Sequence, residues 1–236
     1  MGVNNGVKNE RALIESLNGK THSKLNKNLK KFIQALFPGC KNSDVIKCKK
    51  QEGNAKGDLK VSIEKNTKSV SVKVGTGLSI HEENFYTFKK EFLDKHNCSS
   101  AVKKTLENFI VSGPSASKQV ITQDKKTQAQ KFLTENKQSL LERFMKNGRT
   151  NIHADYIYYG NCNTGCLMEI DEAIKLFSSV THRGYFQVGG ISLQAYCREC
   201  GNKTTEQSQR LQAKISTPAL NIFNKKNTIS YEECDD

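Results

Sequence analysis

The sequence predicts a protein of the α/β or α+β class that folds as a single domain over residues 1–236. Segments with apolar residues at helical spacing dominate its first two thirds. Two strictly alternating segments interrupt them at 57–75, and further strand-like segments follow Gly148. Because no strong linker divides these segments, we expect one folded unit.

Two helices are expected before the alternating segments. The segment NERALIESLNGK at 9–20 begins with an asparagine that can cap a helix and ends at Asn-Gly, which can stop one. The segment LNKNLKKFIQALFPG at 25–39 has leucine, phenylalanine and isoleucine at helical spacing and ends at Pro38-Gly39. A basic, loop-like segment from Cys40 to Gly57 follows.

The segment GDLKVSIEKNTKSVSVKVG at 57–75 predicts a β-hairpin with one apolar and one polar face. Because side chains alternate between the faces of a strand, the pairing must keep both apolar sets together. A two-residue turn at Lys65-Asn66 and a four-residue loop at 65–68 both satisfy this parity. In the first register Asp58 lies opposite Lys73, and in the second it lies one diagonal away. In either register Asp58, Ser71 and Lys73 share the polar face.

Three further helices are expected after the hairpin. The segment HEENFYTFKKEFLDKH at 81–96 has apolar residues at helical spacing and acidic residues in its first turn, and the other two helices fall at about 100–111 and 124–146. Beyond Gly148 the segments IHADYIYYG, YFQVGGISLQAY and SQRLQAKIS favour strands, and MEIDEAIKLFSS favours a helix between them.

The charge of the chain indicates a polyanionic partner. Lysine and arginine number 37 against 24 aspartate and glutamate residues, a net charge of +13, which favours nucleic acid first and an anionic membrane surface second. There is no run of about 18 apolar residues, and the N-terminus lacks the apolar stretch of a signal peptide. The start MGVNNG also lacks the serine or threonine of a myristoylation signal. We therefore expect a cytoplasmic protein with no membrane partner.

Asp58 and Lys73 on one strand face form a candidate site for phosphodiester hydrolysis. A carboxylate can hold a divalent cation against a phosphate, while a neighbouring lysine orients or activates the attacking water. The alternative is a surface cross-strand ion pair, which contributes little to stability.

The pattern Gly57-Asp58 followed by Ser71-Val72-Lys73, with Glu15 on a helix upstream, resembles the PD-(D/E)xK nuclease superfamily, especially type II restriction endonucleases. The order of helix, basic loop, aspartate-bearing strand and lysine-bearing strand adds to this resemblance, which covers about 8–95. It implies a central mixed sheet flanked by helices, with a catalytic core at about 8–112 and DNA recognition at about 150–216.

The resemblance also implies an activity. The protein would be a magnesium-dependent, sequence-specific DNA endonuclease of a restriction-modification system, acting on double-stranded DNA. A palindromic target would be matched most simply by a homodimer.

The sequence departs from the motif at two positions. Gly57 stands in place of the proline, and Ser71 in place of the second acid, where its hydroxyl is a much poorer ligand for a hard cation. Glu82 and Glu83, expected in the first turn of the 81–96 helix, are the first candidates for the missing ligand, and Glu83 is preferred because Glu82 can cap that helix. Glu15 is the third candidate, and its alternative is a solvent-facing position on the first helix.

Four of the cysteines come in two close pairs, Cys162/Cys166 and Cys197/Cys200. Four thiolates at such spacings could form a closed, tetrahedral structural zinc site. That site would brace the C-terminal part rather than catalyse, because four protein ligands leave no open position. The alternative is free cysteines on neighbouring strands and loops.

Basic and amide side chains suggest how DNA would be bound. The lysines before the Asp58 strand, expected to contact the DNA backbone, are Lys41, Lys47, Lys49, Lys50 and Lys56. The residues expected to offer groups to purine edges are Arg183, Gln187, Gln194, Arg198 and Asn202.

Two other functions stay open at this stage. One is a non-catalytic, zinc-braced DNA-binding protein in which Ser71 marks a decayed site. The other is a repair or junction nuclease of the same fold.

Overall fold

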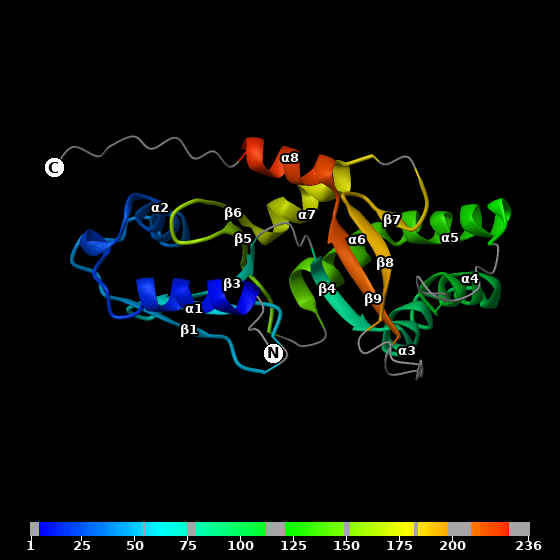
Figure 1. Ribbon diagram of the computed structural model, residues 1–236, viewed down its shortest axis with the longest axis horizontal. Coiled ribbons are helices and arrows are strands. Elements are labelled where there is room, and N and C mark those ends of the chain that lie inside the picture. Colours follow the sequence, from blue (N-terminus) through cyan, green and yellow to red (C-terminus); the bar gives the residue numbers. More distant parts are fainter. Residues whose placement is uncertain are drawn as a thin grey trace. The chain divides into compact units, whose positions relative to one another are not determined.

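The computed structural model describes residues 5–53, 55–74, 79–111, 121–148, 152–181, 184–197 and 209–226. These residues form several helices and two β-sheets, which confirms the mixed α/β class (Figure 1). The chain divides into two compact units, each assembled from separate stretches of sequence. Unit 1 comprises Met1–Leu78, Met145–Lys175 and Leu220–Asp236, and unit 2 comprises Ser79–Phe144 and Leu176–Ala219.

Unit 1 is built on a five-stranded mixed sheet with the order β1-β2-β3-β5-β6. Strands β1 (Ile46–Lys50), β2 (Leu59–Ile63) and β3 (Asn66–Lys73) form an antiparallel meander. Strand β5 (Tyr156–Gly160) pairs with β3 in parallel, and β6 (Gly165–Glu169) pairs with β5 as an antiparallel hairpin. Strand β3 is therefore central, with a neighbour on each side.

Helices α1 (Asn5–Leu17) and α2 (Lys27–Leu36) pack on the sheet of unit 1, and the short η1 (His22–Lys24) joins them. Both helices were expected from the sequence. The strand side chains in the shared core are Ile46, Cys48, Leu59, Val61, Ile63, Val70, Val72, Tyr158 and Leu167. Because strand side chains alternate, the face that carries Asp58, Ser71 and Lys73 lies opposite to this core.

The hairpin β2–β3 adopts a register that neither expected turn provides. Leu59 pairs with Val70 and Ile63 with Asn66, so the turn lies at Glu64 and Lys65, and Glu64 adopts a φ of 51°. Continued by one residue, this register sets Asp58 opposite Ser71 rather than opposite Lys73. Asp58, Ser71 and Lys73 nevertheless lie on the same face of the hairpin, as predicted.

Unit 2 contains a four-stranded antiparallel sheet with the order β4-β9-β8-β7. Its strands are β4 (Ser79–Asn84), β7 (Gln187–Val188), β8 (Ile191–Cys197) and β9 (Gln209–Ile215). The helical segments between β4 and β5 are α3 (Phe85–Phe88), η2 (Lys89–Leu93), α4 (Ser100–Val111), α5 (Gln123–Glu135), α6 (Lys137–Leu141) and η3 (Glu142–Asn147). Helices α7 (Ile170–Ser179) and α8 (Thr217–Lys226) each contribute residues to both units. No helix in the described stretches is long and apolar enough to cross a membrane.

The helix expected over 81–96 begins later than predicted. Ser79–Asn84 form β4, which pairs with β9, and the helical segment starts at Phe85. The side-chain oxygen of Asn84 caps it by accepting hydrogen bonds from the backbone N–H groups of Tyr86 (2.9 Å) and Thr87 (3.3 Å). Glu82 and Glu83 therefore lie on a strand and not in a first helical turn.

The two units do not follow the division expected from the sequence. Residues 79–111, expected in the catalytic core, belong to unit 2, while β5 and β6, expected in the recognition part, complete the sheet of unit 1. A parallel strand pair requires a long crossover connection, and here the connection between β3 and β5 contains the first stretch of unit 2.

Candidate active site

Asp58 is held at the start of β2 by three donors to one carboxylate oxygen. Its Oδ2 accepts hydrogen bonds from the backbone N–H of Val72 (2.6 Å), the Ser71 hydroxyl (3.2 Å) and the Lys73 ammonium (3.2 Å). The Asp58 N–H donates to the Val70 carbonyl (2.8 Å), which fixes its backbone against β3. The structure thus brings together Asp58, Ser71 and Lys73. The other carboxylate oxygen, Oδ1, takes no part in these three contacts.

The Lys73 ammonium is placed by two acceptors. Besides Asp58, it donates to the carbonyl of Val72 at 2.9 Å. The side chains of Lys73 and Asp58 are 15% and 28% exposed, so the pair is shielded from bulk solvent but open to a ligand. Partial burial lowers the effective dielectric constant and strengthens the pair relative to a fully exposed one.

Ser71 serves in this structure as a hydrogen-bond donor to Asp58. The residue is only 2% exposed, and its hydroxyl donates to the Oδ2 atom of Asp58. A carboxylate at this buried position would face the carboxylate of Asp58, and two like charges at this separation repel unless a cation lies between them. The serine therefore stabilises Asp58 in the absence of metal.

Gly57 lies close to the neighbouring strand. A Cβ atom at this position would lie 2.0 Å from the Ser69 hydroxyl oxygen. A proline in place of Gly57 would require the Ser69 side chain to move, which gives a steric reason for this departure from the motif.

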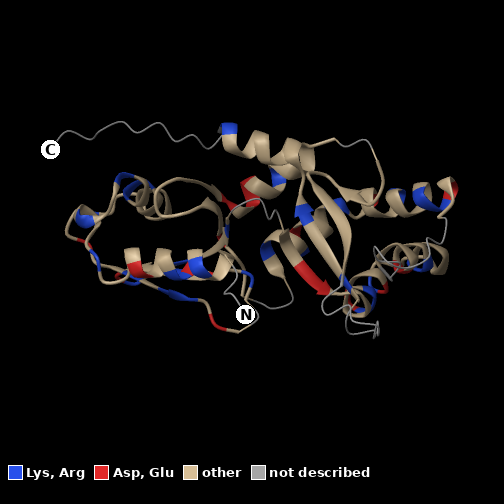
Figure 2. Ribbon diagram, in the orientation of Figure 1, with Lys and Arg blue, Asp and Glu red and all other residues tan. Residues whose placement is uncertain are grey.

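The sheet face that carries Asp58 also carries lysines. The β1–β2 register places Lys49 opposite Lys60, and Lys47 lies on the same face, opposite Ser62. Figure 2 shows basic residues along β1. Lys47 and Lys49 are exposed and Lys60 is half-buried. Like charges directly opposite each other destabilise a sheet, so the facing pair Lys49 and Lys60 lowers its stability.

Not every predicted lysine shares this face. Lys50 points to the α1 side, where its ammonium lies 3.4 Å from the carboxylate of Glu10. The backbone N–H groups of Lys41 and Lys56 donate to Asp44 (2.8 Å) and to the Ile152 carbonyl (3.1 Å). Of the five lysines expected to contact the DNA backbone, Lys47 and Lys49 are those that strand alternation places on the sheet face of Asp58.

Glu83, the preferred candidate for the second acid, is buried in unit 2 and paired with Arg143 and His81. Arg143 binds it in a bidentate manner, with Nε 2.9 Å from Oε1 and Nη2 2.6 Å from Oε2, and His81 Nε2 lies 3.0 Å from Oε1. Burial disfavours the charged carboxylate, but the hydrogen bonds from Arg143 and His81 outweigh it and lower the pKa of Glu83 to about 2. Both oxygens are engaged, so the structure does not support Glu83 as the second ligand.

The other two candidate acids are Glu82 and Glu15. Glu82 forms an ion pair with Arg210 on β9. Glu15 is exposed and lies on the side of α1 opposite to the buried Leu13 and Leu17, which face the core. Glu15 therefore faces solvent, which was the alternative prediction for this residue.

Two residues with defined partners escaped the sequence-based predictions. Arg143 neutralises Glu83, which is 60 positions away in the sequence, and also binds Glu91 at 2.9 Å. The residues around Arg143 in the sequence do not indicate its pairing with Glu83. Asp155 joins β3 to β5, since its Oδ2 accepts from the Ser69 N–H (2.7 Å) and its own N–H donates to the Ser69 carbonyl (2.8 Å). Its position directly before a strand is the signal that could have identified it.

Asp58 offers a carboxylate to a magnesium ion at this site. Within the described stretches no group of three or more histidine, cysteine, aspartate or glutamate residues is arranged to hold a metal. Magnesium is commonly bound through one or two carboxylates, with water and substrate phosphate completing its shell. Asp58, through Oδ1, can supply one such carboxylate, the smaller of these two numbers.

The first of the two predicted cysteine pairs lies at the β5–β6 hairpin. Cys162 lies in the β5–β6 turn, and its sulfur is 3.4 Å from the Ser16 hydroxyl on α1. Cys166 lies on β6 next to Leu167, whose side chain is in the core, so alternation directs Cys166 to the other face. Cys200 and the side chain of Cys197 lie outside the described residues.

The residues predicted to read bases are only partly described. Gln187 lies on β7, where its backbone N–H donates to Gln130 Oε1 (3.0 Å) and its carbonyl accepts from Gln130 Nε2 (2.8 Å). Gln194 is exposed on β8. Arg183, Arg198 and Asn202 lie outside the described residues.

No family model matches the sequence, and no curated protein matches it either.

Proposed function

We propose that the protein is a magnesium-dependent DNA endonuclease. The observation that carries this proposal is the Asp58–Lys73 pair, 3.2 Å apart on a sheet face that also bears Lys47, Lys49 and Lys60. The carboxylate would be a metal ligand, and the ammonium group would act on the attacking water. The row of lysines would form a surface for the phosphate backbone.

Each residue of the pair would have a distinct role. Asp58 would hold the magnesium ion through Oδ1, since Oδ2 is engaged by the hairpin, and the ion when bound would polarise the scissile phosphate. Lys73 would orient the attacking water and stabilise the negative charge that develops on the phosphate during attack. The short contact to the Val72 carbonyl limits the positions that the ammonium can take.

Within this class we favour a type II restriction enzyme, on the resemblance of Gly57-Asp58 and Ser71-Val72-Lys73 to that family. A homodimer on double-stranded DNA would follow for a palindromic target. A non-catalytic DNA-binding protein is the second candidate, because Ser71 occupies the place of the second acid and Glu82 and Glu83 both bind arginines.

Cleavage of supercoiled plasmid DNA in the presence of magnesium tests the proposal. We expect discrete fragments from the wild type, and none from Asp58→Ala or Lys73→Ala. Lys68→Ala is a matched control, because Lys68 is on the same strand but faces the core side, with its ammonium 5.7 Å from the centre of the Tyr156 ring. DNA binding without any cleavage by the wild type would favour the second candidate, and equal activity of all variants would refute the assigned site.

A further inference from the structure

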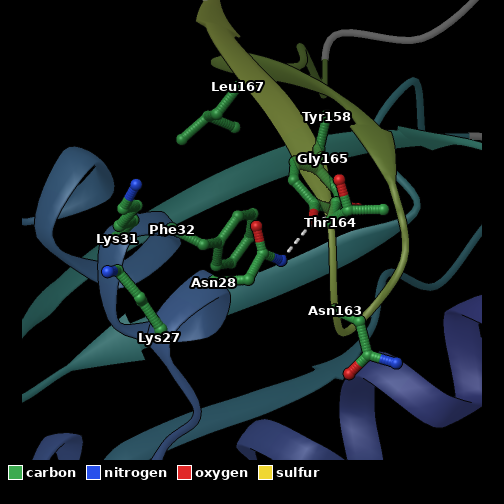
Figure 3. Close-up of a pocket in the computed structure, with 9 residues that line it drawn as sticks. All are labelled: Lys27, Asn28, Lys31, Phe32, Tyr158, Asn163, Thr164, Gly165 and Leu167. Carbon is green, nitrogen blue, oxygen red and sulfur yellow. Dashed lines mark hydrogen bonds between the residues drawn. The ribbon is translucent and has the colours of Figure 1, made fainter. Parts of the chain in front are cut away.

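Unit 1 contains a pocket of about 290 Å³ that is separate from the Asp58 site (Figure 3). It is lined by residues of α2, β5, the β5–β6 turn and β6, namely Lys27, Asn28, Lys31, Phe32, Tyr158, Asn163, Thr164, Gly165 and Leu167. Phe32, Tyr158 and Leu167 belong to the core on one face of the sheet. Asp58 lies on the opposite face, so the pocket and the proposed active site share no residue.

The polar part of the pocket is positively charged. Lys27 and Lys31 lie one turn apart on α2, and both side chains border the pocket in Figure 3. Lys27 is also the first residue of α2, where the helix dipole adds partial positive charge. None of the nine described lining residues is acidic. Because like charges at this spacing destabilise a helix, their placement favours an anionic ligand.

The opposite part of the pocket is an ordered aromatic wall. The rings of Phe32 and Tyr158 pack edge to face, with centres 4.9 Å apart at 68°. The Tyr158 hydroxyl donates to the Asn161 carbonyl (2.6 Å) and accepts from the side-chain amide of Asn28 (2.9 Å). Burial raises the pKa of Tyr158 to about 12, so the phenol is neutral and adds no negative charge to the wall.

Gly165 allows the β6 strand to close on this wall. A Cβ atom at Gly165 would lie 2.3 Å from the Tyr158 ring and its hydroxyl oxygen. The pocket therefore depends on glycine at this position, and its shape is set by contacts within unit 1.

We propose that this pocket binds a small phosphate ester of mononucleotide size. The two lysines would bind the phosphate, Asn163 and Thr164 would offer polar groups to the remainder, and the Phe32–Tyr158 wall would contact its apolar or planar part. The volume is at the low end of small-molecule sites, which fits one nucleotide rather than a larger cofactor. The proposal does not require that the protein is a nuclease.

Calorimetric titration of the full chain with the four deoxynucleoside 5′-monophosphates tests this inference. We expect saturable binding of at least one, and at least about tenfold weaker binding of the matching nucleoside and of inorganic phosphate. The double variant Lys27→Gln/Lys31→Gln should weaken binding by about tenfold or more. Lys30→Gln, on the same helix but outside the pocket lining, should leave it unchanged.

Three results would overturn the proposal. They are the absence of saturable binding by all four nucleotides, inorganic phosphate binding as tightly as the nucleotide, and an equal loss of affinity in Lys30→Gln and the double variant. Circular dichroism confirms folding of each variant, and Asp58→Ala should bind the nucleotide normally even where it has lost DNA cleavage.

Discussion

The ammonium nitrogen of Lys73 lies 3.2 Å from Oδ2 of Asp58, the same oxygen that accepts the Val72 N–H at 2.6 Å. One carboxylate oxygen thus holds the end of the hairpin together, and the other remains for a ligand. Asp58 therefore has a structural role through Oδ2 and a proposed chemical role through Oδ1. Different substitutions can separate the two roles.

Asp58→Asn should abolish cleavage while keeping most of the fold. The amide retains one oxygen that can accept from Val72, but it carries no charge to hold a magnesium ion. We expect a decrease of at least about 100-fold in the cleavage rate, the range seen on loss of a single group that stabilises developing charge. A time course of plasmid cleavage measures it.

Asp58→Ala should in addition destabilise unit 1. It leaves the Val72 N–H and the buried Ser71 hydroxyl without the acceptor that they have in the wild type. The expected loss in the free energy of unfolding is about 1–3 kcal/mol. Urea denaturation should therefore rank wild type, Asp58→Asn and Asp58→Ala in decreasing order of stability, and equal stability of all three would contradict the hydrogen-bonding role.

Lys49→Ala and Lys60→Ala should weaken DNA binding without a preference for sequence. If each lysine contacts one phosphate, each substitution should reduce the slope of log affinity against log salt by about one. Stability should change little, because removing one lysine of the facing pair relieves repulsion. Fluorescence anisotropy over a salt series measures the slope, and Lys68→Ala on the other face should leave it unchanged.

Local patterns in the sequence predict part of this structure well. Apolar spacing identifies α1 and α2, and strand parity places Asp58, Ser71 and Lys73 on one face whichever turn forms. The turn itself could not be chosen, because Glu64 adopts a positive φ that its residue type does not favour. Parity is a local property of each strand, whereas the register depends on how the two strands pack.

Long-range partners account for most of what the sequence does not reveal. The segment SIHEEN has charged residues that suit a first helical turn as well as a strand, and pairing with β9, more than 120 positions later, makes it a strand. The same applies to Glu83, whose partner Arg143 is 60 positions away. The parallel pairing of β3 with β5 likewise depends on a crossover that no local pattern signals.

Glu83 should make the stability of unit 2 depend on pH in acid. Its folded-state pKa is about 2 against an ordinary value of 4.5, so its contribution is full above pH 4.5 and is lost as the pH falls towards 2. This difference corresponds to about 3 kcal/mol. Glu83→Gln should be destabilised at pH 7, since Arg143 loses a charged partner but keeps Glu91.

Urea denaturation at pH 7 and pH 3 distinguishes this role from a metal-binding one. The difference between wild type and Glu83→Gln should be smaller at pH 3, where the wild-type carboxylate has lost part of its advantage. Glu82→Gln, one position away on β4, is the control. A magnesium-dependent rise in the melting temperature that Glu83→Gln abolishes would instead return Glu83 to the metal site.

Ser71→Asp should convert a hydrogen-bonded site into one that requires a cation. A second carboxylate opposite Asp58 would be buried and repelled by its neighbour, so without metal the variant should lose about 1–3 kcal/mol relative to wild type. Magnesium would bridge the two carboxylates and restore much of that loss, because binding to the folded state alone stabilises it. Ser71→Asn is the matched control, since it adds a similar volume without the charge. Melting temperatures in EDTA and in magnesium should therefore differ most for Ser71→Asp, and an equal response in all three proteins would show that Asp58 does not mark a metal site.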